Sequence, residues 1–303
     1  VFADEQKAAL TPQIYLSGGE FYMGSSYVGA DYKKDNPPDG GKQPRIVEVK
    51  AFWLDEHAVT NEQFIDFIND TGYETDADKF GWSFVLAYFA SEETTIKADN
   101  DMGRIEGDPS WLGVREATWE HPLGPDSDVE DILDHPVVQV SWNDARAYCK
   151  WAGRRLAREK EWEYAARSGL VGQPFPWGKE ATPQQLNYWQ GDFPLKNNVE
   201  DGYAGTAPVK SFEPNSFGFY NMVGNVWEWV GGGSKEKRIL KGGSFIDSID
   251  ASFNHPALVS TRQLTTADSG NMNTGFRCAS DAEVDDNEEI IDLSESKPPK
   301  KEL

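Results

Sequence analysis

The sequence has little cysteine, little histidine and no long hydrophobic run. Its 303 residues include two cysteines and four histidines, and no histidines stand at metal-ligand spacing. Three of the four, His121, His135 and His255, precede proline, which is typical of turns. No apolar stretch approaches the roughly 18 residues needed to cross a bilayer, so we expect no membrane insertion. Residues 1–4 lack a signal-peptide pattern and are typical of a mature or trimmed start.

Positive charge is also scarce. Lysine and arginine total 29 against 51 aspartate and glutamate residues, which gives a net charge of −22. Such a chain repels phosphate backbones, so nucleic-acid binding is excluded as a main function. The same acidic surplus is compatible with binding a cation.

Material for a large core is plentiful. The chain is 38% hydrophobic and has 11 tryptophans and 16 phenylalanines. Its length allows either two domains or one large one. The 28 glycines and 17 prolines interrupt the pattern, and we find no internal repeat and no long helical periodicity. Together these observations favour an irregular α+β domain with many loops.

Three features point to the secretory pathway. Residues 300–303 read Lys-Lys-Glu-Leu, close to the Lys-Asp-Glu-Leu retrieval signal of the endoplasmic reticulum, with a chance match as the alternative. Asn69 begins an Asn-Asp-Thr glycosylation sequon. Cys149 and Cys278 can form a disulfide in an oxidising lumen, or they remain buried free thiols that behave as small hydrophobes.

Local patterns predict short elements. Residues 14–23 alternate around two glycines, which predicts a hairpin, and residues 47–53 predict a second strand. Capping patterns predict helices that begin at Thr60 and Ser141 and end near Gly72 and Gly153. A further helix carries Trp162, Ala165 and Ala166 on one side, and residues 137–140 predict a short strand.

The remaining segments are expected to contain little regular structure. Residues 73–135 are loop-rich, and the aromatic residues at 80–84 are expected to fill the core rather than form a binding site. Residues 170–217 are loops punctuated by proline and glycine. Residues 1–12 are expected to form a loose N-terminal arm, residues 13–281 the domain, and residues 282–303 an acidic, disordered tail.

The most informative stretch is residues 218–247. Asn221 and Glu228 bracket a tight run with Gly224 between them, and glycine permits a backbone that turns its carbonyls inward. An amide oxygen, carbonyls and a carboxylate suit a hard cation such as Ca²⁺. The alternative is a turn residue and a surface glutamate between core tryptophans.

This stretch also carries a family resemblance. Gly-Asn-Val-Trp-Glu-Trp at 224–229, followed by Lys-Gly-Gly-Ser-Phe at 241–245, resembles the formylglycine-generating enzyme (sulfatase-modifying factor) family. Supporting motifs follow in the family's order at 19–24, 140–145, 155–167, 174–178 and 275–278. The resemblance covers residues 13–281 and implies one large irregular α+β domain of this family's fold, which is C-type-lectin-like. Ala157 and Arg158 depart from the family's Pro-Thr helix start, which implies a small loss of helix capping.

The resemblance implies two structural Ca²⁺ sites and one disulfide. The first site matches the side chains of Asn187 and Asp201 with the carbonyls of Tyr188 and Tyr203. The second site matches the set Asn221, Gly224, Val226 and Glu228. The family's structural disulfide matches Cys149 and Cys278.

The family's catalytic cysteines are absent. The enzyme oxidises a substrate cysteine in a Cys-x-Pro-x-Arg context and holds Cu(I) with two thiolates five residues apart, after Gly-Gly-Ser. Asp247 and Ser252 stand at the matching positions. Copper is a soft ion that needs soft ligands, so we expect no copper and no oxidase chemistry. The chain therefore resembles an inactive branch of the family, a luminal glycoprotein understood to associate with sulfatases and the active enzyme, as a homodimer or heterodimer, and to restrain modification.

Several alternatives stay open. By resemblance, Trp227, Ser244, Asp247, Ser252 and Arg262 line a peptide groove, although Trp227 is equally a core residue and Ser244 a backbone partner. Asp247, Ser252 and His255 are the residue types of a hydrolytic triad, but no nucleophile elbow surrounds the serine. A histidine-based iron site lacks its ligand spacing. A scaffold reused for an unrelated ligand is the last alternative.

Overall fold

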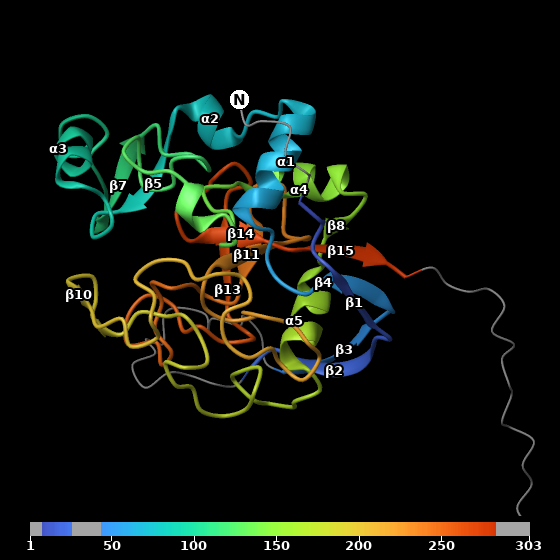
Figure 1. Ribbon diagram of the computed structural model, residues 1–303. Coiled ribbons are helices and arrows are strands. Elements are labelled where there is room, and N and C mark those ends of the chain that lie inside the picture. The colour runs from blue at the N-terminus through green and yellow to red at the C-terminus, as the bar shows by residue number, and fades with distance from the viewer. Residues whose placement is uncertain (1–7, 26–43, 283–303) are drawn as a thin grey trace, which may run out of the picture.

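The chain folds as an α+β domain built from small sheets. The computed structural model describes residues 8–25 and 44–282 (Figure 1). One four-stranded sheet has the order β1 (Gln13–Leu16), β4 (Phe52–Asp55), β15 (Cys278–Asp281), β8 (Arg155–Leu156). A second, central sheet has the order β13 (Arg262–Thr265), β12 (Arg238–Lys241), β11 (Trp227–Val230), β14 (Thr274–Phe276). No helix of the described residues is long and apolar enough to cross a membrane.

The smaller elements surround these two sheets. A third sheet has the order β5 (Trp82–Leu86), β7 (Asp108–Arg115), β6 (Arg104–Ile105), and two further pairs join β2 (Gly19–Met23) to β3 (Arg45–Val49) and β9 (Gly191–Asp192) to β10 (Lys196–Asn197). The helices are α1 (Asn61–Thr71), α2 (Asp76–Phe80), α3 (Glu92–Asn100), α4 (Trp142–Trp151) and α5 (Glu159–Arg167), with a 3-10 turn at Glu130–Ile132.

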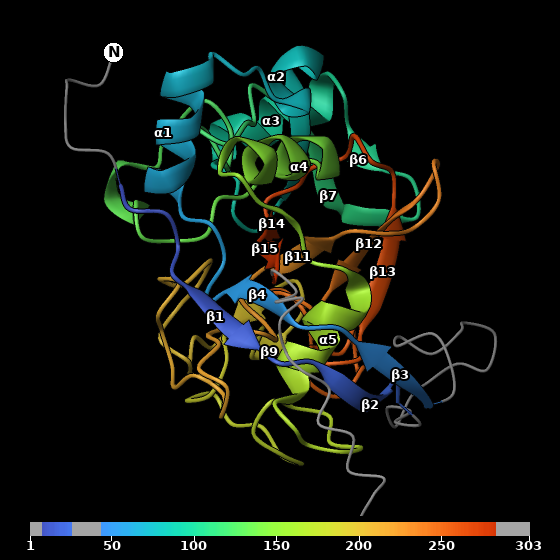
Figure 2. The ribbon, with the colours of Figure 1, turned by 90° about the vertical axis from the view of Figure 1, so that its right-hand side faces the viewer.

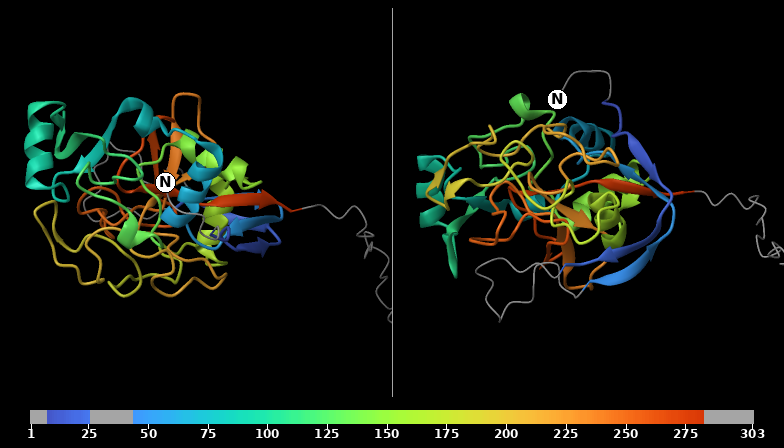
Figure 3. Two further views of the ribbon diagram at one scale, coloured as in Figure 1. Left: turned by 45° about the horizontal axis from the view of Figure 1, so that its top comes forward. Right: turned by 90° about the horizontal axis from the view of Figure 1, so that it is seen from below.

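The predicted N-terminal hairpin is wrong. β1 pairs with β4 and β2 pairs with β3, so the two strands expected to face each other lie in different sheets. Gly18 makes the bend with φ +74, and a Cβ there would lie 2.2 Å from the Val49 carbonyl oxygen. The predicted strand 47–53 is likewise two strands, because the chain changes sheet at residues 50 and 51. The N-terminal strands curve around one end of the molecule (Figure 3), where Phe21 packs edge-on against Tyr164 of α5.

The capped helices are confirmed. Thr60 and Gln63 form a reciprocal capping box on α1, and Ser141 does the same with Asp144 on α4. Gln63 also holds residues 8–12, by accepting from the Thr11 hydroxyl and donating to the Ala9 carbonyl, so this part of the N-terminal arm is not loose. Residues 1–7 and the tail from residue 283 lie outside the described residues.

Helix α5 has no side-chain acceptor at its N-cap, the residue that precedes Glu159. Arg158 occupies that position, and the Glu161 carboxylate accepts from its backbone N–H at 2.8 Å. The same carboxylate pairs with the guanidinium of Arg155 at 2.7 Å. This carboxylate satisfies one donor at the helix start, so half of a capping box remains where the threonine is missing.

Residues 73–135 contain many loops, as predicted, together with the sheet β5–β7–β6 and two α-helices. Two other predictions for the middle of the chain are wrong. Phe80 is 50% exposed, and Phe84 lines a cavity instead of filling the core. Residues 137–140 form no strand, because Gln139 adopts φ 59 and its amide donates to the carbonyls of Phe84 and Pro122.

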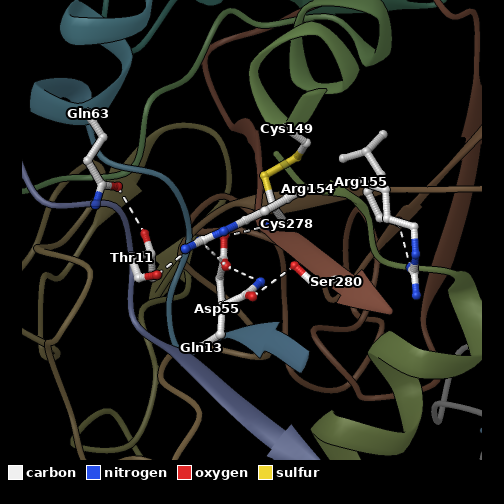
Figure 4. Close-up of a disulfide and its surroundings, with 10 residues drawn as sticks. Thr11, Gln13, Asp55, Gln63, Cys149, Arg154, Arg155, Cys278 and Ser280 are labelled. Atoms are coloured by element: carbon white, nitrogen blue, oxygen red, sulfur yellow. Dashed lines mark hydrogen bonds and ion pairs between the residues drawn. A yellow bond between two sulfur atoms is a disulfide. The ribbon is translucent and has the colours of Figure 1, made fainter. Parts of the chain in front are cut away.

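Cys149 and Cys278 form a disulfide. The bond joins the end of α4 to β15, with the two Cα atoms 5.6 Å apart and both residues fully buried. Asp55 lies beside it, accepts from the Cys278 backbone N–H at 2.8 Å and pairs with Arg154 at 2.6 Å (Figure 4). The disulfide thus ties α4 to β15, and Asp55 of β4 is held to the same place by a hydrogen bond to β15 and an ion pair with Arg154.

Burial of Asp55 predicts a pH-dependent stability. Desolvation raises the pKa of its carboxyl to about 7, although Arg154 opposes the rise. A raised folded-state pKa contributes stability that is complete below the unfolded value and is lost as pH rises through about 7. We expect the free energy of unfolding of the native chain to fall by roughly 2 kcal/mol relative to Asp55→Asn between pH 5 and pH 8. Urea unfolding of both proteins at each pH measures this, and a constant difference would contradict it.

Candidate functional site

A cavity of about 340 Å³ lies between the central sheet and the sheet β5–β7–β6. One wall comes from the central sheet, including Trp227 and Trp229 of β11. The other wall comes from the region expected to be loops, and its residues are Phe84, Ile105, Asp108 and Trp111. The loop after β12 closes one end with Asp247, Asn254 and His255.

Strand alternation decides which side chains face this cavity. Trp229 pairs with Leu240 and Leu240 with Gln263, and all three line the cavity. Successive side chains of a strand point to opposite faces. The next row of the same strands, Glu228, Lys241 and Arg262, therefore points away from the cavity, toward α5.

The row that faces α5 is a buried charged layer. Lys241 is fully buried and binds Glu163 of α5 at 3.0 Å. Glu228 binds Arg277 at 2.7 Å with both side chains almost inaccessible. At the edge of the layer, Arg262 reaches Glu159 at 2.8 Å. The Lys241–Glu163 and Arg262–Glu159 pairs fix α5 against the sheet that forms the cavity wall.

Asp247 is the buried acid of the cavity. Its Oδ2 accepts from the backbone N–H and the hydroxyl of Ser244, at 2.8 and 2.7 Å, and its Oδ1 accepts from the His255 backbone N–H at 3.2 Å. Burial raises the pKa of this carboxyl above its usual range, although the nearby His255 and these hydrogen bonds oppose the rise. Desolvation outweighs these opposing interactions and favours the neutral form of the carboxyl.

The five predicted groove residues divide into three groups. Trp227 and Asp247 line the cavity. Ser244 is fully buried behind Asp247 and accepts from the Asn273 amide at 2.8 Å, so it positions the acid rather than facing a ligand. Ser252 is exposed and donates to Asp250 at 2.6 Å. Arg262 faces α5, as described above, so neither of these two lies at the floor of the cavity.

The hydrolytic triad is not assembled. Asp247 and His255 both border the cavity, and the His255 ring meets Trp227 edge-on at 5.3 Å. The Ser252 hydroxyl, however, binds Asp250 and is not among the cavity-lining side chains. The nucleophile of such a triad must reach its base directly, and here it belongs to an exposed turn.

Sequence reasoning missed the second wall of the cavity. Asp108 and Trp111 come from β7. The available signal was the strand pattern of β5, which begins Trp-Ser-Phe, together with that of β7. It also missed Asn273, which is 3% exposed with its Oδ1 unpartnered by any described residue. These groups give the cavity aromatic sides and a few polar atoms, an arrangement typical of ligand sites.

Hydrogen bonds join three of the four residues of the first predicted calcium site, because Asp201 accepts from the backbone N–H groups of Tyr188 and Tyr203. Asn187 is 1% exposed, and its Oδ1 has no hydrogen-bond partner among the described residues. The Gln190 amide donates to both the Tyr188 carbonyl and Asp201 Oδ2, which places these two acceptors around one donor. Asp201 Oδ1 accepts from the Tyr203 backbone N–H at 2.9 Å. The unpartnered Asn187 oxygen, the Asp201 carboxylate and the Tyr188 carbonyl are all oxygen ligands of the kind that a hard cation takes.

The second predicted set fits a cation less well. Glu228 Oε2 accepts from Trp162 and Arg277, and its Oε1 accepts from Arg277. The carboxylate thus retains about one free acceptor direction out of four. Asn221 and Gly224 both have positive φ, 47 and 71, so this run turns tightly as the sequence suggested. No group of three or more His, Cys, Asp or Glu that could hold a metal occurs in residues 8–25 and 44–282. Most ligands of the two predicted calcium sites are amide or carbonyl oxygen atoms, to which that statement does not apply.

Comparison with known proteins establishes the family. A family model described as the sulfatase-modifying factor enzyme 1-like domain matches residues 1–282. The chain belongs to this family. The fold agrees, since the structure of PvdO from Pseudomonas aeruginosa superposes with a TM-score of 0.61 at 23% identity and covers 89% of this chain and 94% of that one. The family resemblance drawn from the motifs is therefore confirmed.

Individual relatives place the chain within this sulfatase-modifying factor family. The protein named inactive C-alpha-formylglycine-generating enzyme 2 of Bos taurus is 46% identical over 277 residues, covering 89% of this chain and 88% of its own length. The formylglycine-generating enzyme of Streptomyces coelicolor is 42% identical over 294 residues, covering 90% of each. The chain is thus similar both to relatives named inactive and to relatives named as enzymes.

Proposed function

We propose that this protein is a non-catalytic member of the family that binds sulfatases or the active formylglycine-generating enzyme and modulates cysteine-to-formylglycine modification. The observation that carries the proposal is that both cysteines of the chain are in a disulfide, so neither provides a thiolate. The chain has only these two cysteines, and the disulfide that joins them is buried between α4 and β15. Neither cysteine lines the cavity.

The groups that replace the family's cysteines support the same conclusion. Asp247 offers hard oxygen atoms that already accept three hydrogen bonds, and soft Cu(I) prefers sulfur. Ser252 is turned to the surface and engaged by Asp250. A hydroxyl is neither a thiolate nor able to form a mixed disulfide with a substrate cysteine. We expect the cavity to bind a peptide, and it lacks the groups that would oxidise one.

The compartment belongs to the same proposal. A disulfide between fully buried residues is typical of proteins that fold in an oxidising lumen. Asn69 is exposed in the last turn of α1, where a glycan is sterically tolerated. These features support a compartment of the secretory pathway, and we assign the protein to the lumen of the endoplasmic reticulum.

A peptide titration tests the proposal. The purified chain is titrated with a Cys-x-Pro-x-Arg peptide, its Cys→Ser analogue and a scrambled control, and peptide mass is followed in parallel. We expect both motif peptides to bind and their masses to stay unchanged. Asp247→Ala should alter peptide affinity less than about threefold, since a non-catalytic groove does not need this acid for turnover. Oxidation of the peptide by rigorously purified chain, abolished by Asp247→Ala, would establish an enzyme with altered chemistry instead.

We also propose that Asn187, Tyr188, Asp201 and Tyr203 hold a structural Ca²⁺. A cation bound only by the folded state stabilises it by about 2.7 kcal/mol at a hundred times its dissociation constant. We expect millimolar Ca²⁺ to raise the melting temperature of chelator-treated protein by on the order of 5 °C. Asp201→Asn should lose this shift, whereas Asp192→Asn, on exposed β9 nearby, should keep it. Equal shifts in both variants would exclude this site.

A further inference from the structure

A basic depression lies on this strongly acidic protein. Its volume is about 750 Å³. Seven basic side chains and one acid, Glu159, line it; the basic ones are Arg45, Arg146, Lys150, Arg154, Arg155, Arg158 and Lys160. This local concentration of positive charge is opposite in sign to the net charge of the chain, which is −22. These lining residues define what we call the basic depression.

Three parts of the fold build the basic depression. Trp142, Arg146 and Lys150 are spaced four apart on α4, which places them on one face of that helix. The segment from β8 to the start of α5 supplies a second side, and the pair β2–β3 supplies a third through Met23 and Val47. Figure 2 looks toward the side of the molecule that carries α4, α5 and β3.

Four of the basic side chains have no carboxylate partner among residues 8–25 and 44–282. Lys150 has no ion pair there, and the Arg146 guanidinium lies 5.7 Å from the Trp142 ring. Arg45 contacts the sulfur of Met23 at 3.5 Å. Lys160 donates to the Glu48 carbonyl at 2.8 Å. Uncompensated charges gathered in one concavity attract an anionic ligand.

The chain leaves the described fold at the rim of this depression. Asp281, at the end of β15, accepts from Arg155 at 2.7 Å and from Arg158 at 3.2 Å, and both arginines line the basic depression. Residues 283–295 follow directly and contain seven acidic residues and no basic one. The same 13 residues include the apolar Val284, Ile290, Ile291 and Leu293. Thirteen extended residues reach at most about 45 Å.

We propose that residues 283–295 bind in the basic depression of their own chain. The seven acids of the segment are more than enough to pair with the four basic side chains that lack a carboxylate partner, and its apolar residues match Met23, Val47 and Leu156 of the lining. Attachment at Asp281 makes the binding intramolecular, so the local concentration of the segment is on the order of millimolar. An external anionic ligand must displace this segment before it can bind. The inference does not depend on the proposed function.

A peptide competition experiment tests this proposal. The full chain is compared with a variant carrying Asp285→Asn, Asp286→Asn, Glu288→Gln and Glu289→Gln, each titrated at low salt with a fluorescent peptide of residues 283–295. We expect the neutralised variant to bind the peptide at least tenfold more tightly than the native chain, whose own segment competes. Adding Arg146→Glu and Lys150→Glu to the neutralised variant should abolish binding. The matched charge control, Lys179→Glu with Lys196→Glu on exposed positions outside the depression, should bind the peptide.

Three results would overturn the proposal. Equal affinity of the native and neutralised chains would show that the depression is open and belongs to an external polyanion. Loss of binding in the charge control would show an effect of net charge alone. If light scattering detects dimers of the native chain but none of the neutralised variant, the segment binds a second copy of the chain. The melting temperature of each variant shows whether it folds. If the variant with Arg146→Glu and Lys150→Glu does not fold, Lys150→Gln alone replaces it in the neutralised background. We expect Lys150→Gln to lower the affinity for the peptide three- to tenfold.

Discussion

Removing the disulfide is expected to lower the free energy of unfolding by about 5 kcal/mol. Cys149 and Cys278 are 129 residues apart in sequence, so the bond closes a long loop in the unfolded chain. In the chain-entropy model a loop of this length is worth about 5 kcal/mol, which is an upper estimate. The Cys149→Ala, Cys278→Ala double variant should melt on the order of 10 °C lower.

Alanine is the right replacement because both sites are fully buried among apolar residues. A serine hydroxyl there would add a desolvation cost that has nothing to do with the bond. Thermal unfolding of the native chain in reductant gives an independent measure of the same loss. A shift below about 2 °C in both experiments would show that the unfolded chain gains little freedom when the bond is absent.

Arg277→Met is expected to destabilise the fold by about 3 to 5 kcal/mol. Arg277 is fully buried and bonds Glu228 with two nitrogen atoms, at 2.8 and 2.7 Å. It also donates to the carbonyls of Glu56 and Tyr220, at 3.1 and 2.8 Å. Methionine fills similar space but leaves a buried carboxylate without its counter-charge, and such losses are typically 3–5 kcal/mol.

The exposed pair Arg115–Asp101 gives the matched control. Its nitrogen–oxygen distance is also 2.8 Å, but the two side chains are 57% and 50% exposed. Surface pairs of this kind contribute less than about 1 kcal/mol, so Arg115→Met should change urea unfolding little. Similar losses in the two variants would mean that the charged layer behind the central sheet is not a source of stability. Adding Glu228→Gln to Arg277→Met should recover part of the loss, because it removes the stranded charge.

Local signals predicted the elements that local chemistry determines. Thr60 with Gln63 and Ser141 with Asp144 specify helix starts through contacts three residues apart, and both capping boxes are present. Strand pairing was harder to predict, because it depends on partners far away in sequence. The two strands around Gly18 were expected to pair with each other, yet each pairs with a strand from residues 45–55.

The candidate site was predicted only in part for the same reason. The family motifs located Trp227 and Asp247, which line the cavity, but the opposite wall comes from β5, β6 and β7, where no motif was recognised. Arg262 was placed in the groove although its strand neighbour Gln263 is the residue that faces it. A one-residue change in alternation reverses the face of a strand, and motif position alone does not determine that face.

The position of β15 has a consequence for how the protein is made. β4 lies between β1 and β15, and β15 also pairs with β8, so strands from both ends of the domain share one sheet. During synthesis, Cys149 emerges long before its partner Cys278. The growing chain therefore presents an unpaired thiol and an unfilled gap in the sheet until the last strand has left the ribosome. During this interval the unpaired strand edges and the exposed apolar surface make the growing chain prone to aggregation.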